Sequence, residues 1–123
     1  MINVIFDFES LGLNENSVLL SLGVLAFDPS DYDIAGDGVN ATFNKLLQQG
    51  LYVKLDAKDQ MKTYGRHINK STLIWWTEQN EEASQVLTKS DDDVKLPDME
   101  SLLNEYLEMN GVTRNTPVWS RGY

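Results

Sequence analysis

Two acidic residues, Asp7 and Glu9, stand directly after the first apolar run of the chain, residues 2–6. That run consists mostly of β-branched or aromatic residues and predicts a short buried strand. Side chains two apart in a strand project to the same face, so both carboxylates can reach one point in space. Paired anionic oxygens at the end of a strand suit Mg²⁺ or Mn²⁺. The pattern therefore predicts a metal site, although acids also end strands because they favour turns.

The residues that follow Glu9 could let a ligand approach the backbone closely. Ser10 provides a hydroxyl group, and Gly12 lacks a Cβ atom. A second, longer apolar run covers residues 18–27 and ends at Asp28-Pro29. Its nearly continuous apolar character predicts a central strand that is buried on both faces. The two carboxylates of the acidic pair are expected to point to the same side at the rim of the sheet.

Further strands and helices are predicted along the rest of the chain. Residues 39–43 and 51–55 are expected to be strands, with a short turn or helical piece at 45–49 between them. Residues 56–69 are polar and mixed in charge, which predicts a loop or a ragged helix start. Asn69 or Ser71 can then cap a helix that continues to about residue 85.

The C-terminal part contains an amphipathic helix and a short strand. Asp98 is expected to cap the helix, because apolar residues at helical spacing follow it, and Gly111 supplies a C-terminal stop. Pro117-Val118-Trp119 begins the strand. Strands that are followed by helices predict a fold of the α/β (α+β) class.

Length and composition narrow the classes of protein. The chain has 123 residues, which corresponds to one domain over residues 1–123 without a second domain. The absence of cysteine excludes disulfides, zinc–thiolate sites and cysteine nucleophiles. A net charge of −9 argues against a DNA-binding module that depends on a broad basic patch. No segment has the apolar length of a membrane span or the pattern of a leader, so a cytoplasmic protein without membrane contact is expected.

Three blocks resemble one known family. Residues 7–12 resemble the first metal motif of the DnaQ-like (RNase H-like, DEDD) 3′→5′ exonucleases. Residues 71–79 resemble the Ser-Thr-x-x-Trp-Trp-x-x-Gln stretch of the phage exonuclease A branch of that family. Residues 118–122 resemble the strand that leads into the second metal motif. The resemblance implies an RNase H-like mixed β-sheet flanked by helices and truncated after the fourth strand, so that the chain is the N-terminal part of one exonuclease domain.

The same resemblance implies a two-metal mechanism with Mg²⁺ or Mn²⁺. Asp7 would bridge the two ions, Glu9 would bind the ion that carries the attacking water, and Phe8 would point into the core. Ser10, Leu11 and Gly12 would contact the 3′ end of single-stranded DNA or RNA. These residues would be the part of the active site that this chain contributes.

Two more residues are predicted to bind substrate. A helix can bury only one of the adjacent residues Trp75 and Trp76, and an exposed ring could stack on a nucleobase; Trp76 is assigned to this role, with core packing as the alternative. Arg121 follows the last predicted strand and could contact a phosphate.

Tyr123 is the last residue, before the other acids and the general base of the family pattern. The isolated chain is therefore expected to be catalytically incomplete. The alternative is a non-catalytic nuclease fold that serves as a binding or regulatory module. An apolar face that later elements would cover predicts self-association or a partner that covers it. If the chain is encoded by a phage, its location would be the host cytoplasm.

Overall fold

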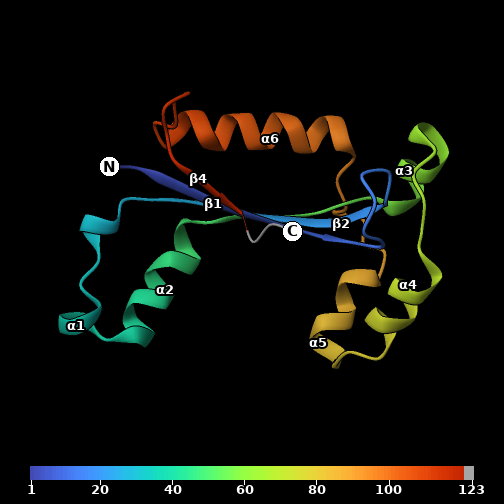
Figure 1. Ribbon diagram of the computed structural model, residues 1–123, viewed down its shortest axis with the longest axis horizontal. Coiled ribbons are helices and arrows are strands. Elements are labelled where there is room, and N and C mark those ends of the chain that lie inside the picture. Colours follow the sequence, from blue (N-terminus) through green and yellow to red (C-terminus); the bar gives the residue numbers. More distant parts are fainter. Residues whose placement is uncertain (121–123) are drawn as a thin grey trace. The chain divides into compact units, whose positions relative to one another are not determined.

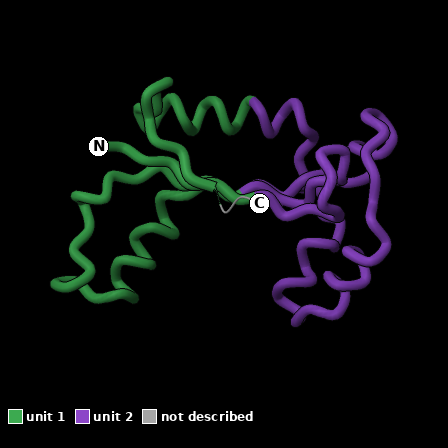
Figure 2. Tube along the Cα trace, in the orientation of Figure 1, with its two compact units in different colours: residues 1–7, 23–52, 101–123 green, residues 8–22, 53–100 purple. Residues whose placement is uncertain are grey.

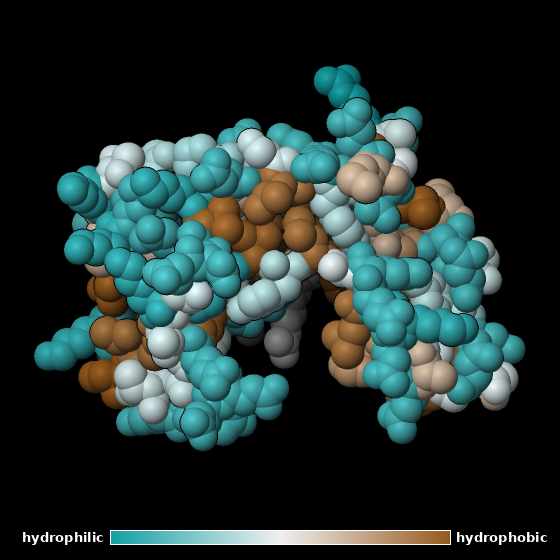
Figure 3. All heavy atoms as spheres, turned by 180° about the vertical axis from the view of Figure 1, so that it is seen from behind, coloured by the Kyte–Doolittle hydropathy of each residue, from teal (hydrophilic) through white to brown (hydrophobic). Residues whose placement is uncertain are grey.

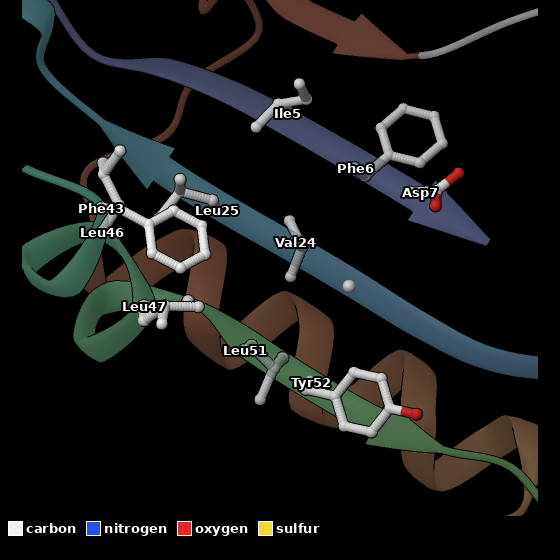
Figure 4. A pocket seen from close by; sticks show the side chains of 12 residues that line it. Ile5, Phe6, Asp7, Val24, Leu25, Phe43, Leu46, Leu47, Leu51 and Tyr52 are labelled. Atoms are coloured by element: carbon white, nitrogen blue, oxygen red, sulfur yellow. The ribbon is translucent and has the colours of Figure 1, made fainter. Parts of the chain in front are cut away.

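A four-stranded mixed sheet organises the protein. The computed structural model describes residues 1–120, and its strands are β1 (Asn3–Ser10), β2 (Leu19–Phe27), β3 (Leu51–Lys54) and β4 (Val118–Ser120) (Figure 1). Their order in the sheet is β3-β2-β1-β4. β4 runs parallel to β1, with Val4 opposite Val118, whereas the arrows of β1 and β2 point in opposite directions (Figure 4). The predicted α/β class and the mixed sheet that the resemblance implies are both confirmed, and β1 lies between β2 and β4.

Six α-helices and two short 3₁₀ turns connect the strands within residues 1–120. The α-helices are α1 (Ile34–Asp37), α2 (Val39–Gln49), α3 (Ala57–Tyr64), α4 (Lys70–Thr77), α5 (Glu81–Ser84) and α6 (Leu96–Met109). The 3₁₀ turns are η1 (Pro29–Asp31) and η2 (Gln85–Leu87). None of the helices in this described range is long and apolar enough to cross a membrane.

The chain divides into two compact units, which Figure 2 shows in green and purple. Unit 1 consists of residues 1–7, 23–52 and 101–123. Its buried core comprises Val4 of β1 with Val24 and Ala26 of β2, and apolar residues of α6 pack against them. Tyr106 of α6 also anchors this layer, because its hydroxyl accepts a hydrogen bond from the Ala26 N–H at 2.9 Å and donates one to the Gln49 carbonyl at 2.7 Å.

Unit 2 consists of residues 8–22 and 53–100. Its core is formed by four buried residues, Leu11, Val18, Leu20 and Trp76. Partly buried apolar residues of α3, α4 and η2 pack around this cluster. The fully buried Gln60 adds a polar anchor, since its side-chain amide pairs with both the N–H and the carbonyl of Leu19, at 2.8 and 2.7 Å.

One predicted strand is wrong. Residues 39–43 belong to helix α2 and not to a strand. Gly38 precedes the helix with φ 85°, a conformation that favours glycine. The apolar residues Val39, Phe43, Leu46 and Leu47 then recur at the period of a helix and not at the alternation of a strand. The β-branched and aromatic composition of the segment favoured the wrong structure.

The predicted helices are found, with different ends. The predicted helix at 69–85 is two helices, because the Asn80 side chain accepts from the Ala83 N–H at 2.8 Å and caps a new helix there. Of the two predicted caps, Asn69 is the one that caps α4, and Ser71 lies within the helix. Residues 57–64 form a regular helix, capped by Asp56, where a loop or ragged start was predicted. α6 begins at Leu96, so Asp98 lies in its first turn and is not its cap.

Several apolar side chains remain at the surface. Ile5 of β1 is exposed, and so are Phe43 and Leu47 of α2 and Val118 and Trp119 of β4. Seen from behind, apolar side chains in brown lie open on the surface (Figure 3). The prediction of a strand buried throughout residues 2–6 is therefore wrong, because only Val4 in that run is fully buried.

Candidate metal centre

The acidic pair lies in the last part of β1. The strand covers Asn3–Ser10, so Asp7 and Glu9 occupy positions i and i+2 of one extended segment, where side chains share a face. The Asp7 side chain is exposed and Glu9 is half-buried. Phe8 between them is 36% exposed, so the expectation that it points into the core is wrong. Phe6 and residues of α6 pack against the core cluster that contains Val4, and Phe8 is not part of that cluster.

The Asp7 carboxylate is open to a ligand. Within residues 1–120 it makes no ion pair or hydrogen bond, so both of its oxygens remain available. Among the described residues of unit 1, it is the only charged one that lines a groove of about 440 Å³ between β1, β2, β3 and α2. Figure 4 shows this lining, with Val24, Leu51 and Tyr52 along the neighbouring strands. The groove therefore brings one carboxylate to the edge of an apolar surface.

The segment after Glu9 forms a tight connection to β2. The Leu11 N–H donates to the Val18 carbonyl at 2.8 Å, and the Ser10 hydroxyl donates to the Gly12 carbonyl at 2.6 Å. A Cβ atom on Gly12 would lie 2.3 Å from Oγ of the buried Ser17, so glycine is needed for this close approach. The Leu11 side chain is buried in the core of unit 2. The sequence prediction gave these three residues a role with substrate, and the fold also uses them to shape the turn.

Trp76 is placed in the core and not on the surface. Its side chain is 8% exposed, whereas that of Trp75 is 52% exposed. The prediction that α4 buries one ring and exposes the other is confirmed, but Trp76 is the buried one and has no free ring face for a nucleobase. The assignment of Trp76 to substrate overlooked a signal for its burial, because Leu73 stands three residues earlier on the same helix face and packs against the same core cluster. Arg121, the other predicted contact, lies outside the described residues.

The donor set suits a hard cation. Two carboxylates on one face of a strand supply the anionic oxygens that Mg²⁺ and Mn²⁺ prefer. Over residues 1–120 there is no group of three or more His, Cys, Asp or Glu side chains that could hold an ion. Asp7 and Glu9 therefore fit part of a coordination shell, and further ligands are needed to complete it.

Comparison with known proteins shows the family to which the chain belongs. A family model described as "3′-5′ exoribonuclease Rv2179c-like domain" matches residues 2–123. The chain belongs to this family. It is also 33% identical over 123 residues to an exodeoxyribonuclease of Enterobacteria phage T4, an alignment that covers 99% of this chain and 51% of that relative. The chain thus spans about half the length of this relative. The 3′-5′ exonuclease family that the sequence blocks indicated is confirmed, together with its α/β fold.

Proposed function

We propose that this chain provides the first metal motif of a metal-dependent 3′-5′ exonuclease that acts on single-stranded DNA or RNA. The observation that carries the proposal is the Asp7–Glu9 pair at the end of β1, with the Asp7 carboxylate open to a ligand, in a chain of the 3′-5′ exonuclease domain family. Both carboxylates can bind a cation from one side of the strand.

In this proposal Asp7 and Glu9 would hold the cations, and Asp7 would be shared between them. Bound divalent cations would supply charge that activates a water and stabilises the leaving oxygen. The turn at Ser10–Gly12 holds β1 and β2 together and presents backbone beside the 3′-terminal nucleotide. Exposure of Asp7 at the surface gives the scissile phosphate access to the acids.

The remaining ligands and the base are proposed to come from a part of the enzyme corresponding to the half of the phage relative that this chain does not span. Two carboxylates carry a charge of −2 against the +4 of a metal pair. The isolated 123-residue chain is accordingly expected to bind metal weakly and to show little activity.

A chimera tests the proposal. In the chimera, this chain replaces the matching half of the T4 exodeoxyribonuclease. The chimeric protein is incubated with 5′-labelled single-stranded DNA or RNA and Mg²⁺. A ladder of shortened products that requires a free 3′ end is expected. Asp7→Asn and Glu9→Gln should each reduce the rate of degradation by more than roughly 100-fold. Loss of a group that only hydrogen-bonds to a metal ligand already costs roughly 10- to 100-fold, and these substitutions remove a ligand itself. Asp31→Asn, at an exposed acid of η1, is the matched control and should retain the rate.

Two results would contradict the proposal. An active chimera whose rate is unchanged in Asp7→Asn would remove the acids from the mechanism. A chimera that folds and binds Mg²⁺ but degrades neither substrate would favour the binding or regulatory module instead.

A further inference from the structure

A basic segment runs along α3 and α4 in unit 2. Residues 57–76 carry four basic side chains and one acid, which is a net charge of +3 within a chain of net charge −9. The four basic residues are Lys58, Lys62, Arg66 and Lys70. They are four of the ten Lys and Arg residues in the chain. This concentration of positive charge is therefore a local property that the acidic total conceals.

The lysines of this segment are available for a ligand. Lys58, Lys62 and Lys70 are exposed, and within residues 1–120 none of them forms an ion pair. The acid of the segment, Asp59, is already engaged: it accepts from the Thr63 hydroxyl at 3.0 Å and pairs with Lys95, just before α6, at 4.0 Å. Its charge is therefore partly compensated from outside the segment, and the lysine charges are not.

Aromatic side chains are interleaved with these charges. Trp75 of α4 is 52% exposed, and Tyr64 at the end of α3 is also exposed. The buried Trp76 supports Trp75, because the two rings meet edge to face with centroids 5.0 Å apart and an interplanar angle of 82°. One indole ring is thus held in place by the core while its neighbour keeps a face open to solvent.

The segment is attached to the residues that follow Glu9. The Asn69 N–H donates to the Leu11 carbonyl at 2.7 Å, and the His67 N–H donates to the Asn16 carbonyl at 2.8 Å. The Trp76 indole N–H donates to the Ser10 carbonyl at 3.0 Å. All of these residues belong to unit 2, so the link between the basic segment and the end of β1 lies within one compact body.

We infer that the α3–α4 strip, defined as Lys58, Lys62, Tyr64, Lys70 and Trp75, binds single-stranded nucleic acid and leads it towards Glu9. The lysines contact backbone phosphates and Trp75 stacks on an unpaired base. The inference rests on the proposed function for the direction of the strand, but the binding itself needs no metal. Positive charges that follow the backbone, combined with an aromatic ring for stacking, are the usual means of binding single strands without sequence preference. In a duplex the bases are stacked on each other and offer Trp75 no free face.

Salt-dependent binding of the 123-residue chain tests the lysines. Fluorescence anisotropy of labelled oligo(dT), oligo(rU) and a duplex is measured in EDTA, so that metal and turnover do not contribute. Lys62→Gln/Lys70→Gln should weaken binding of the single strands several-fold. It should also reduce the slope of log K against log[salt] by about 0.7 for each phosphate that the variant no longer neutralises. The control Lys45→Gln/Lys89→Gln removes the same charge from exposed positions outside the strip.

Substitutions of Trp75 test the stacking. Trp75→Leu should lower the affinity roughly 5- to 150-fold without changing the salt slope, whereas Trp75→Phe should retain most of it. Thermal melting checks that both variants fold. Oligo(dT) and oligo(rU) differ in both sugar and base, so oligo(dU) is added; its comparison with oligo(rU) shows whether the strip prefers DNA or RNA.

Three outcomes would overturn the inference: undetectable binding of single strands, equal losses of affinity in the two double-lysine variants, or duplex binding as tight as single-strand binding. Failure of the proposed function is distinguishable. Asp7→Asn should abolish degradation by the chimera while leaving oligonucleotide binding in EDTA intact. Conversely, variants of the strip should lose oligonucleotide affinity while the metal site stays intact.

Discussion

The indole N–H of Trp76 donates to the backbone carbonyl of Ser10 at 3.0 Å, which fastens α4 to the last residue of β1. These two residues are separated by 66 positions in the sequence. Ser10 directly follows Glu9, so the hydrogen bond restrains the backbone beside a proposed metal ligand. We therefore propose that Trp76, which is buried, is a positioning residue.

Trp76→Phe should remove this hydrogen bond while retaining most of the apolar packing. The expected cost is about 1–3 kcal/mol in the free energy of unfolding, because the Ser10 carbonyl loses its donor. Urea unfolding measures the loss. Trp75→Phe, at the exposed neighbour, is the matched control and should change stability by less than about 0.5 kcal/mol. Equal losses of stability in the two variants would show that the hydrogen bond to Ser10 contributes little.

Replacement of Gln60 should destabilise unit 2 more than its small change in volume suggests. Gln60→Met keeps the length of the side chain but leaves both backbone groups of Leu19 without their partner. A loss of about 2 kcal/mol or more is expected, since each unsatisfied group costs about 1–3 kcal/mol when buried. Gln48→Met, at an exposed position of α2, controls for the substitution itself. A Gln60→Met variant as stable as the wild type in urea would contradict the role of this amide.

Much of the fold follows from local signals that the sequence displays. The cap at Asn69, the stop at Gly111 and the apolar run of β2 depend on neighbouring residues and were predicted correctly. The acidic pair of β1 was also visible, because its i, i+2 spacing needs only an extended chain. The helix α2 was missed because its composition favours a strand, and only the full spacing from Val39 to Leu47 reveals the helical period.

Other features depend on contacts between distant segments and carry no local signal. The pairing of Gln60 with Leu19 and of Trp76 with Ser10 joins residues 41 and 66 positions apart. The choice between Trp75 and Trp76 does carry a local signal, because Leu73 stands three residues before Trp76 and shares its helix face. The lysines of the α3–α4 strip could have been found from the net charge of short segments, since the total of −9 hides them.

Stability should depend on pH through Asp28. Hydrogen bonds from the Ser30 hydroxyl, the N-terminal ammonium group and the Ser30 N–H lower the pKa of Asp28 from 3.8 to about 2. Because the folded-state pKa is lowered, the contribution is complete above the unfolded pKa of 3.8 and is lost as the pH falls towards 2. In urea titrations, Asp28→Asn should be less stable than the wild type near neutral pH, and the difference should shrink through this window. A difference that is constant with pH would contradict this account.

The exposed apolar side chains of α2 should promote association between copies. Leu47 is 63% exposed and, like Phe43, lines the groove of unit 1. Apolar patches of this kind on small proteins usually mark contact surfaces. Sedimentation velocity should therefore show association that increases with concentration, and Phe43→Lys/Leu47→Lys should shift it towards monomer. The control Asn44→Lys/Gln48→Lys adds the same charge at exposed polar positions of the same helix. A wild-type chain that stays monomeric at every concentration would contradict this expectation.

The most direct test of the central claim is a Mn²⁺ titration of the purified chain, followed by water-proton relaxation. If Asp7 and Glu9 form the metal site, the wild type should bind Mn²⁺ weakly, and Asp7→Asn/Glu9→Gln should abolish that binding. Asp91→Asn/Asp92→Asn, in the exposed acidic loop before α6, should leave it unchanged. Binding that survives in Asp7→Asn/Glu9→Gln, or that disappears in the loop variant instead, would contradict the assignment of these two carboxylates as metal ligands.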